Sequence, residues 1–223
     1  MTRNILVTGG AGFIGCNFIQ RWAKQSREPT VVFDALTYAA HPGVVANVPR
    51  AKLIVGSVVD TAVVLETLMT FRPRAVIHMA AESHVDRSIT GSHVFASTNI
   101  MGTLAVLDAV AAYRHSRLCP ADFRFLYVST DEVYGSVPRG EADERHVLDP
   151  RSPYAASKAA AEHLVRAYHV THGLPVLITR GCNTYGPWQH FEKLIPHFVY
   201  CAIQGKPLPI YGDGKHVREW IHV

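Results

Sequence analysis

The chain has 223 residues, 48% of them apolar, which is enough to bury one large core or one domain with part of a second. Its formal net charge is only +4 and its basic residues are scattered. This balance weakly favours an anionic small-molecule ligand and argues against nucleic acid. No apolar stretch approaches the roughly 18 residues of a membrane span, and the pattern of a signal peptide is absent. We therefore expect a cytoplasmic globular protein.

Cysteine and histidine usage bears on metal binding and on disulfides. The cysteines lie far apart without a CxxC pair, at Cys16, Cys119, Cys182 and Cys201. This spacing indicates reduced, mostly buried thiols. His163, His169 and His172 lie close together, but no carboxylate or cysteine completes a ligand set at metal spacing. We expect surface or cap histidines and no metal site.

Short apolar runs alternate with longer helical patterns along the chain. The strand-like runs lie at 5–7, 31–33, 53–55, 75–77, 125–128 and 176–178. The helix-forming patterns lie at 14–25, 61–71, 92–114, 154–172 and 192–204. Strands that are apolar on both faces are typical of a parallel sheet covered by helices on both sides. The order predicts a doubly wound α/β domain over 1–180 and a partial second region over 181–223.

The helix predicted from residue 154 has well-marked ends. Ser152 suits the N-cap, Pro153 the first helical position and Gly173 the C-terminal cap. Tyr154 and Lys158 then lie four residues apart and share one helix face. The preceding stretch, 135–151, has the composition of a surface excursion.

A glycine-rich turn follows the first strand and opens the first helix. Gly9, Gly12 and Gly15 have the GxxGxxG spacing that lets a backbone approach a pyrophosphate, and the helix N-terminus offers free amides to phosphates. A glycine pattern alone is weak, but the strand-turn-helix context makes it strong. Asp34 ends the second strand, where a carboxylate accepts from ribose hydroxyls and repels a 2′-phosphate. The pattern favours NAD over NADP in a Rossmann-type domain, although Asp34 also suits a simple turn.

Two adjacent carboxylates, Asp131 and Glu132, stand beside the hydroxyl of Thr130 just after the fifth predicted strand. Repulsion between neighbouring carboxylates tends to keep one of them protonated, which suits an acid and a base working together. The plainer alternative is a solvated loop-to-helix start. Tyr154 becomes a base if a neighbouring ammonium, such as that of Lys158, stabilises its phenolate. Such a pair alone is often surface helix; with the glycine turn it indicates hydride transfer at an alcohol.

These residues resemble a known family. Gly9–Gly15 and Tyr154–Lys158 are similar to the motifs of the extended short-chain dehydrogenase/reductases. Longer stretches look like the dTDP-glucose 4,6-dehydratases, namely 80–88, 129–135, 183–187 and 192–196. The resemblance covers essentially the whole chain.

The resemblance implies a lyase that converts dTDP-glucose to dTDP-4-keto-6-deoxyglucose through transient reduction of NAD. Tyr154, helped by Thr130, would take the proton of the sugar 4-hydroxyl, with Lys158 as its partner. Glu132 would remove the C5 proton and Asp131 would protonate the departing 6-hydroxyl. The family pattern also suggests a homodimer formed through the helices at 92–114 and 154–172, in deoxysugar biosynthesis.

Residue-by-residue matching extends the resemblance to the binding sites. It implies NAD contacts at Gly9, Gly12, Phe13, Ile14, Gly15, Asp34, Leu36, Thr37, Ser57, Val58, Ala80, Ala81, Ser83, Thr98, Tyr154, Lys158 and Thr184. It implies nucleotide-sugar contacts at Ser83, Thr130, Asn183, Lys193, Leu194 and Arg218. Ser57 stands where the family usually has aspartate, and Thr184 where a second asparagine is common. Lys193 also suits an ordinary helix surface.

Other functions stay open at this point. A UDP-sugar dehydratase, a nucleotide-sugar epimerase and a non-catalytic NAD-binding module share the cofactor pattern, whereas epimerases typically lack the Asp131–Glu132 doublet. Family members also continue beyond residue 223. We expect a fragment of a longer chain; the alternative is a naturally short protein that binds NAD without turnover. The nucleotide base and the downstream pathway are not fixed by the sequence.

Overall fold

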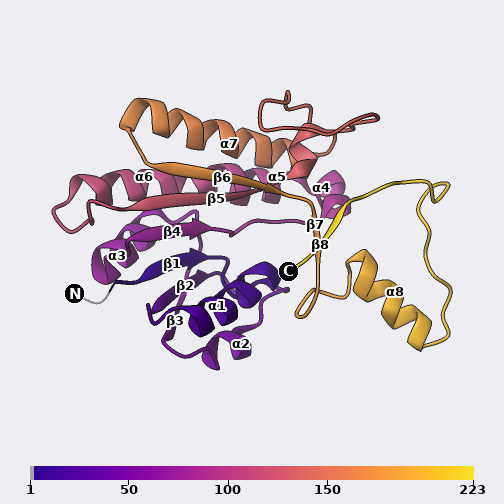
Figure 1. Ribbon diagram of the computed structural model, residues 1–223, viewed down its shortest axis with the longest axis horizontal. Coiled ribbons are helices and arrows are strands. Elements are labelled where there is room, and N and C mark those ends of the chain that lie inside the picture. Colours follow the sequence, from indigo (N-terminus) through magenta and orange to yellow (C-terminus); the bar gives the residue numbers. More distant parts are fainter. Residues whose placement is uncertain (1–2) are drawn as a thin grey trace.

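The computed structural model describes residues 3–223, and a six-stranded parallel sheet forms its centre (Figure 1). The strands are β1 Ile5–Thr8, β2 Thr30–Asp34, β3 Ala51–Val55, β4 Ala75–His78, β5 Arg124–Thr130 and β6 Val176–Gly181. They lie in the order β3-β2-β1-β4-β5-β6, and every predicted strand is present. The order reverses between β1 and β4, as in a doubly wound sheet. The predicted α/β fold is confirmed.

Helices cover both faces of the sheet (Figure 1). They are α1 Phe13–Gln25, α2 Pro42–Ala46, α3 Thr61–Phe71, α4 Val85–Thr90, α5 Ser92–Phe95, α6 Gly102–His115, α7 Pro153–His172 and α8 Leu194–Ile203. Leu6 and Phe33 belong to the core under α3, α6 and α7, whereas Ile5 and Val7 belong to the core under α1 and α2. Neighbouring residues of one strand therefore enter different layers, which explains why the strands are apolar throughout.

The long helix predicted over 92–114 is divided into three parts. A π-helical segment, η1 (Ala96–Met101), joins α5 to α6. At its end the amide of Gly102 donates to the carbonyl of Ser97, five residues back. A Cβ at Gly102 would lie 2.8 Å from a methyl group of Val58, so glycine here allows α6 to approach the loop after β3.

The stretch Ser92–His115 has a mean hydropathy of 1.5, which by length and composition alone would suit a membrane span. No apolar stretch of this length is predicted from the sequence, so the structure differs from that prediction. Half of the stretch is buried, and α6 packs against α3 and α7. Its buried apolar residues therefore belong to the protein core.

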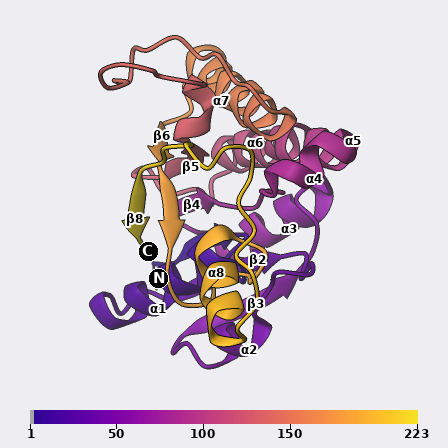
Figure 2. The same ribbon diagram turned by 90° about the vertical axis from the view of Figure 1, so that its right-hand side faces the viewer.

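Several short elements escape prediction because they are shorter than the periods that reveal helices and strands. These are α2, α4, the 3₁₀-helix η2 (Asp131–Tyr134) and the strand β7 (Asn183–Tyr185). Strand β7 pairs in a small parallel sheet with β8 (Trp220–His222), which the strand-like run to Val223 does predict. The segment between α8 and β8 is largely exposed and without regular structure. Helix α8 lies beyond the carboxyl ends of the sheet strands in Figure 1 and stands in front of β2 and β3 in Figure 2.

The ends of α7 follow the predicted capping. The hydroxyl of Ser152 accepts a hydrogen bond from the amide of Ala155 at 3.1 Å, and Pro153 is the first helical residue. Gly173 ends the helix in the left-handed conformation, with φ of 62°. The cap at Ser152 fixes the start of α7 and with it the position of the Tyr154 side chain.

All six parallel strands end at the same edge of the sheet. The turn after β1, Asp34 at the end of β2 and Thr130 at the end of β5 therefore lie along one side of the molecule. In doubly wound sheets the crevice outside this edge, at the point where strand order reverses, holds the ligand. The fold thus gathers the residues that the sequence marked.

Candidate active site

The glycine turn after β1 is packed too closely for side chains. A Cβ at Gly9, where φ is 69°, would lie 2.6 Å from the amide nitrogen of Ala80. A Cβ at Gly15 would lie 2.4 Å from the carbonyl oxygen of Gly9. Gly12 is the N-cap of α1 and offers no side chain to the first-turn amides. The turn therefore presents bare backbone and a helix N-terminus at the carboxyl edge, as a phosphate requires.

Asp34 is anchored to the same turn. Its Oδ2 accepts from the amide of Ala11 at 2.9 Å, and its Oδ1 accepts from the amide of Leu36 at 2.8 Å. The two bonds hold the carboxylate between the glycine turn and the loop after β2. Each oxygen keeps a second lone pair, so the group remains able to accept from ribose hydroxyls. Beside it, Thr37 is exposed.

The remaining predicted cofactor residues fall into two groups. Phe13, Ile14, Ala80, Ala81 and Thr98 are half-buried or exposed near the carboxyl edge. The neighbouring residues Ser57 and Val58 differ from each other in burial. The Val58 side chain is buried in the core under α3 and α6, while Ser57 beside it is exposed. Thr184 donates its hydroxyl to the carbonyl of Cys182 at 3.3 Å.

The glycine turn and the anchored carboxylate together fit a dinucleotide. The absence of Cβ atoms at the turn leaves room for a pyrophosphate, and Asp34 places a negative charge where an adenosine ribose would lie. This charge disfavours a 2′-phosphate at the same point. The residues present therefore match NAD better than NADP.

The two carboxylates lie in the 3₁₀-helix η2, directly after β5. Thr130 caps this helix, because its hydroxyl oxygen accepts from the amide of Glu132 at 3.3 Å. The same hydroxyl donates to Asp131 at 3.2 Å. The alternative for the doublet is right in that the two residues begin a helix, but they are half-buried in a capped turn and not solvated.

Burial raises the pKa of both carboxyl groups, but their charged neighbours differ. Desolvation is the main cause at Asp131, and Glu219 adds a smaller upward effect. At Glu132 desolvation and the charge of Asp131 raise the pKa, while Arg218 and Lys193 oppose the shift. At Asp131 the hydrogen bonds from the Thr130 hydroxyl and from the backbone oppose the shift in the same way. Both pKa values are therefore raised, which moves the pair toward the range in which carboxyl groups exchange protons as an acid and a base.

Tyr154 and Lys158 lie one turn apart at the start of α7. The Lys158 ammonium is 4% exposed, donates to the carbonyl of Val128 at 2.6 Å and lies 4.3 Å from the ring centroid of Tyr127. Burial lowers its pKa to about 7. The sequence predicts this ammonium as the partner of the Tyr154 hydroxyl, whereas here it bonds to backbone.

Burial also raises the pKa of Tyr154, and the nearby charge of Glu132 adds to the shift. A hydrogen bond with Thr130 acts in the opposite direction. The Tyr154 amide donates to Ser88 at 3.2 Å, which ties the start of α7 to α4. Burial thus opposes ionisation of the hydroxyl, so a base at this position depends on cations that stabilise the phenolate.

A buried polar network that the sequence does not reveal runs beneath these groups. His78 is 1% exposed, and its Nδ1 lies 2.6 Å from the hydroxyl of Thr8 while its Nε2 lies 3.1 Å from that of Thr103. Asn99, in η1, donates to the hydroxyl of Ser157 at 2.8 Å. These residues come from separate elements, so no sequence spacing could have identified them.

The predicted nucleotide-sugar residues approach η2 from the C-terminal region. Lys193 donates to the carbonyl of Ser83 at 2.9 Å, and Arg218 is close enough to Glu132 to lower its pKa. The side chain of Asn183, on β7, is half-buried, and Leu194 is 51% exposed at the start of α8. The structure thus brings Ser83, Lys193 and Arg218 to the carboxylates.

A second cluster, also missed by sequence reasoning, holds the segment before α8. The Tyr38 hydroxyl donates to Glu192 at 2.8 Å, and Arg87 pairs with the same carboxylate at 2.9 Å. The Arg87 guanidinium lies 4.1 Å from the ring centroid of Tyr38. These contacts join the loop after β2, the helix α4 and the segment that carries Lys193.

Comparison with known proteins assigns this constellation to a family. The model of the GDP-mannose 4,6 dehydratase family matches residues 6–223. The chain belongs to this family. It is 46% identical over 227 residues to the dTDP-glucose 4,6-dehydratase of Haemophilus influenzae, covering 99% of this chain and 67% of that protein. It is 49% identical over 226 residues to the enzyme of that name from Xanthomonas campestris pv. campestris, covering 98% and 64%.

A solved dehydratase of the same family has this fold. The dTDP-glucose 4,6-dehydratase DesIV of Streptomyces venezuelae, with NAD and dTDP bound, has a TM-score of 0.90 and 46% identity, covering 98% of this chain and 68% of that one. UDP-glucose 4-epimerase of Thermotoga maritima, with UDP-glucose, has a TM-score of 0.88 and 28% identity, covering 98% and 69%. The chain spans about two thirds of the length of these relatives.

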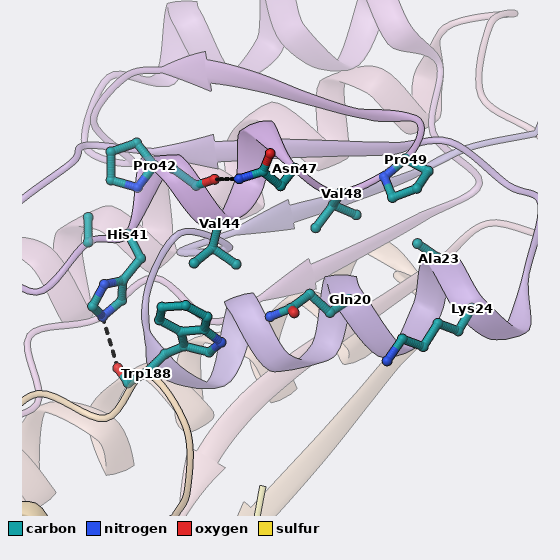
Figure 3. Close-up of a pocket in the computed structure, with 12 residues that line it drawn as sticks. Gln20, Ala23, Lys24, His41, Pro42, Val44, Asn47, Val48, Pro49 and Trp188 are labelled. Atoms are coloured by element: carbon teal, nitrogen blue, oxygen red, sulfur yellow. Dashed lines mark hydrogen bonds between the residues drawn. The ribbon is translucent and has the colours of Figure 1, made fainter.

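One cavity of this dehydratase-family chain lies away from the carboxylates. A cavity of about 670 Å³ opens between α1 and the α2 region, beneath Trp188 (Figure 3). His41 Nε2 lies 2.9 Å from the carbonyl oxygen of Trp188, and Gln20 and Lys24 reach toward the cavity from α1. No residue of the glycine turn, η2 or α7 lines it. The candidate catalytic residues therefore lie apart from this cavity.

The buried ammonium of Lys158 leads to a prediction about stability and pH. The folded protein lowers its pKa from 10.5 to about 7, so the unfolded chain binds more protons between these values. The contribution of Lys158 to the free energy of unfolding therefore increases as pH rises from 7 toward 10. The free energy of unfolding of wild type and of Lys158→Met is measured by urea denaturation without cofactor at each pH. The value for wild type minus the value for the variant should rise over this range.

The exposed Lys24 on α1 provides the control. The same difference taken with Lys24→Met should stay flat across the range. A flat difference for Lys158→Met as well would show that the ammonium is not desolvated in solution.

Proposed function

We propose that this chain forms the NAD-binding and catalytic part of a nucleotide-sugar 4,6-dehydratase, a lyase that converts dTDP-glucose to dTDP-4-keto-6-deoxyglucose. The observation that carries the proposal is the half-buried Asp131–Glu132 pair, capped by Thr130 and electrostatically coupled to Tyr154. Relatives with the dTDP-glucose dehydratase name, at 46% and 49% identity, support the choice of substrate. The domain at 1–180 would hold NAD, and 181–223 would contribute to the sugar site.

The chain's own groups supply the proton transfers of this reaction. NAD, when bound, would accept hydride from C4 of the sugar and later return it to C6. Tyr154 would receive the proton of the 4-hydroxyl, and the Thr130 hydroxyl, which here donates to Asp131, would favour the ionised form once it turned to donate to Tyr154. A cationic cofactor ring would act in the same direction. The Lys158 ammonium, whose pKa lies near 7, remains able to hold or release a proton.

The two carboxylates would divide the elimination between them. Glu132, kept toward its ionised form by Lys193 and Arg218, would remove the C5 proton that the 4-ketone acidifies. Asp131, whose pKa burial raises, would protonate the departing 6-hydroxyl so that water leaves. When hydride is returned to C6, a proton that exchanges with solvent on Glu132 would return to C5, and the proton taken up by Tyr154 would restore Asp131.

The nearest alternative is a nucleotide-sugar 4-epimerase. UDP-glucose 4-epimerases share the fold, with identities of 28% and 31% and TM-scores of 0.88 and 0.87 for two of them. An epimerase would need the Tyr154–Lys158 pair but has no step for a base and an acid at C5 and C6. The doublet therefore favours the dehydratase.

The proposal extends to assembly and location. We infer a cytoplasmic homodimer in which two copies meet through α5, η1, α6 and α7. An open groove on this side supports it, lined by Ser92, His93, Ala96, Ile100, Pro153, Ala156, Ser157 and Ala160. Val94 and Met101, on the same helical stretch, are each 55% exposed. Covering such apolar residues would favour association.

The glycine turn predicts the effect of adding one methyl group. Gly9→Ala would force a Cβ to within 2.6 Å of the Ala80 amide at a positive φ, so we expect NAD affinity to fall at least about tenfold and stability to drop. The matched control is Gly43→Ala, because a Cβ there meets nothing within 4 Å. Calorimetric NAD titration and urea denaturation measure both effects. Equal affinities in the two variants would contradict the cofactor site.

The proposed base predicts a split between the half-reactions. Glu132→Gln should lower product formation by about 10²–10⁴-fold, the usual contribution of a positioned base, while dTDP-glucose still reduces part of the bound NAD. Absorbance of the reduced nicotinamide and chromatography of the sugar nucleotide separate the two steps. Normal dehydration by this variant would remove Glu132 from the mechanism, and absence of any reduction in wild type would favour a binding module.

A further inference from the structure

Arg180 lies outside the residues marked by the sequence, yet it contacts both of the elements that carry the proposed catalytic residues. It is on β6, and its guanidinium is largely buried, with the side chain 12% exposed. Its Nε donates to both carboxylate oxygens of Glu162, at 3.1 and 3.0 Å, and its Nη2 donates to Oε2 at 2.6 Å. Its Nη1 donates to the Tyr134 hydroxyl at 2.8 Å. One planar group therefore bridges two elements.

The first of these elements is α7. Glu162 is fully buried and lies one turn beyond Lys158, which itself lies one turn beyond Tyr154. The three side chains therefore share one face of the helix. The Glu162 charge also acts on Lys158, since it opposes the lowering of that pKa by burial. Fixing Glu162 fixes the helix face that carries the tyrosine and the lysine.

The second element is η2. Tyr134 is the last residue of this 3₁₀-helix, two positions after Glu132, and its ring lies 4.9 Å from the guanidinium carbon of Arg180. The chain then turns sharply at Gly135, where φ is 72° and a Cβ would lie 2.1 Å from the carbonyl oxygen of Asp149. Tyr134 is thus held at one end of the segment that carries the two carboxylates.

We propose that Arg180 is a positioning residue that holds η2, and with it Asp131 and Glu132, in register with Tyr154 and Lys158 on α7. Neither Arg180 nor Glu162 is placed to touch the sugar, so the effect is transmitted through Tyr134. Buried ion pairs contribute little net stability compared with apolar packing, so a geometric role accounts for this one better than a stabilising role. The inference rests on the proposed dehydratase function.

The reaction explains why such a bridge matters. Oxidation at C4 uses the α7 residues, whereas elimination uses the η2 residues on the same bound sugar. A displacement of about 1 Å between the two elements is enough to slow a step about 10²-fold. A small shift of η2 should therefore slow elimination and leave oxidation nearly unchanged.

The variant Tyr134→Phe tests this directly, because it keeps the ring and removes the hydroxyl that Arg180 contacts. In single-turnover reactions of the NAD-loaded protein with dTDP-glucose, we expect elimination to slow about tenfold and reduction of NAD to change less than about twofold. The matched control is Tyr168→Phe. Tyr168 lies farther along α7, and its hydroxyl donates to Asp108 on α6. This variant should change neither step.

Amide hydrogen exchange supplies a readout that does not need turnover. The peptide 130–135 includes the amide of Gly135, which donates to Glu132, and the amide of Glu132, which donates to Thr130. Exchange in this peptide should become faster in Tyr134→Phe than in Tyr168→Phe, while the peptide around Tyr154 stays unchanged. This pattern would reflect local loosening of η2.

Arg180→Lys is the second variant, since an ammonium keeps the charge beside Glu162 but lacks the fork that reaches Tyr134 as well. It should keep cooperative unfolding and repeat the selective loss of elimination. Equal slowing of both steps, or unchanged exchange in 130–135, would overturn the positioning role. If wild type forms no product from dTDP-glucose, the proposed function fails instead, and the exchange result alone decides whether Arg180 holds η2.

Discussion

Where β1 and β4 diverge at the sheet edge, the backbone of Gly9 lies so close to Ala80 that a Cβ would stand 2.6 Å from the amide nitrogen. This contact joins the phosphate-type turn to the segment 80–83, which in turn meets Lys193 from the C-terminal region. The carboxylate of Asp34 is fixed against the same turn. The geometry of the cofactor crevice therefore depends on a backbone approach that only glycine allows.

Burial gives the catalytic groups their chemistry. The same desolvation raises the pKa of the carboxyl groups of Asp131 and Glu132 and lowers that of the Lys158 ammonium to about 7. All three groups thereby move toward neutral pH, where proton transfer in either direction is efficient. The cations near Glu132 then separate its role from that of Asp131. Arg180 links the two elements that carry these groups, because it pairs with Glu162 on α7 and donates to Tyr134 on η2.

Local patterns were sufficient for most of the fold and for the centre of the site. The glycine turn, Asp34 and the Tyr154–Lys158 spacing are each set within one strand-turn-helix unit or one helix, so the sequence reveals them. The position of the Lys158 ammonium was not predictable, because its partner, the Val128 carbonyl, comes from β5. Arg180 and His78 escaped for the same reason, since their partners lie on other elements. Glu162 did carry a signal, because it continues the four-residue spacing of Tyr154 and Lys158.

The central claim is that this chain removes water from a nucleotide sugar by way of proton exchange at C5. Mass spectrometry of dTDP-glucose after incubation with the protein and NAD in heavy water tests it most directly. We predict a product that has lost one water and gained one deuterium. A sugar of unchanged mass, with NAD demonstrably bound, or a product that has lost water without gaining deuterium, would contradict the claim.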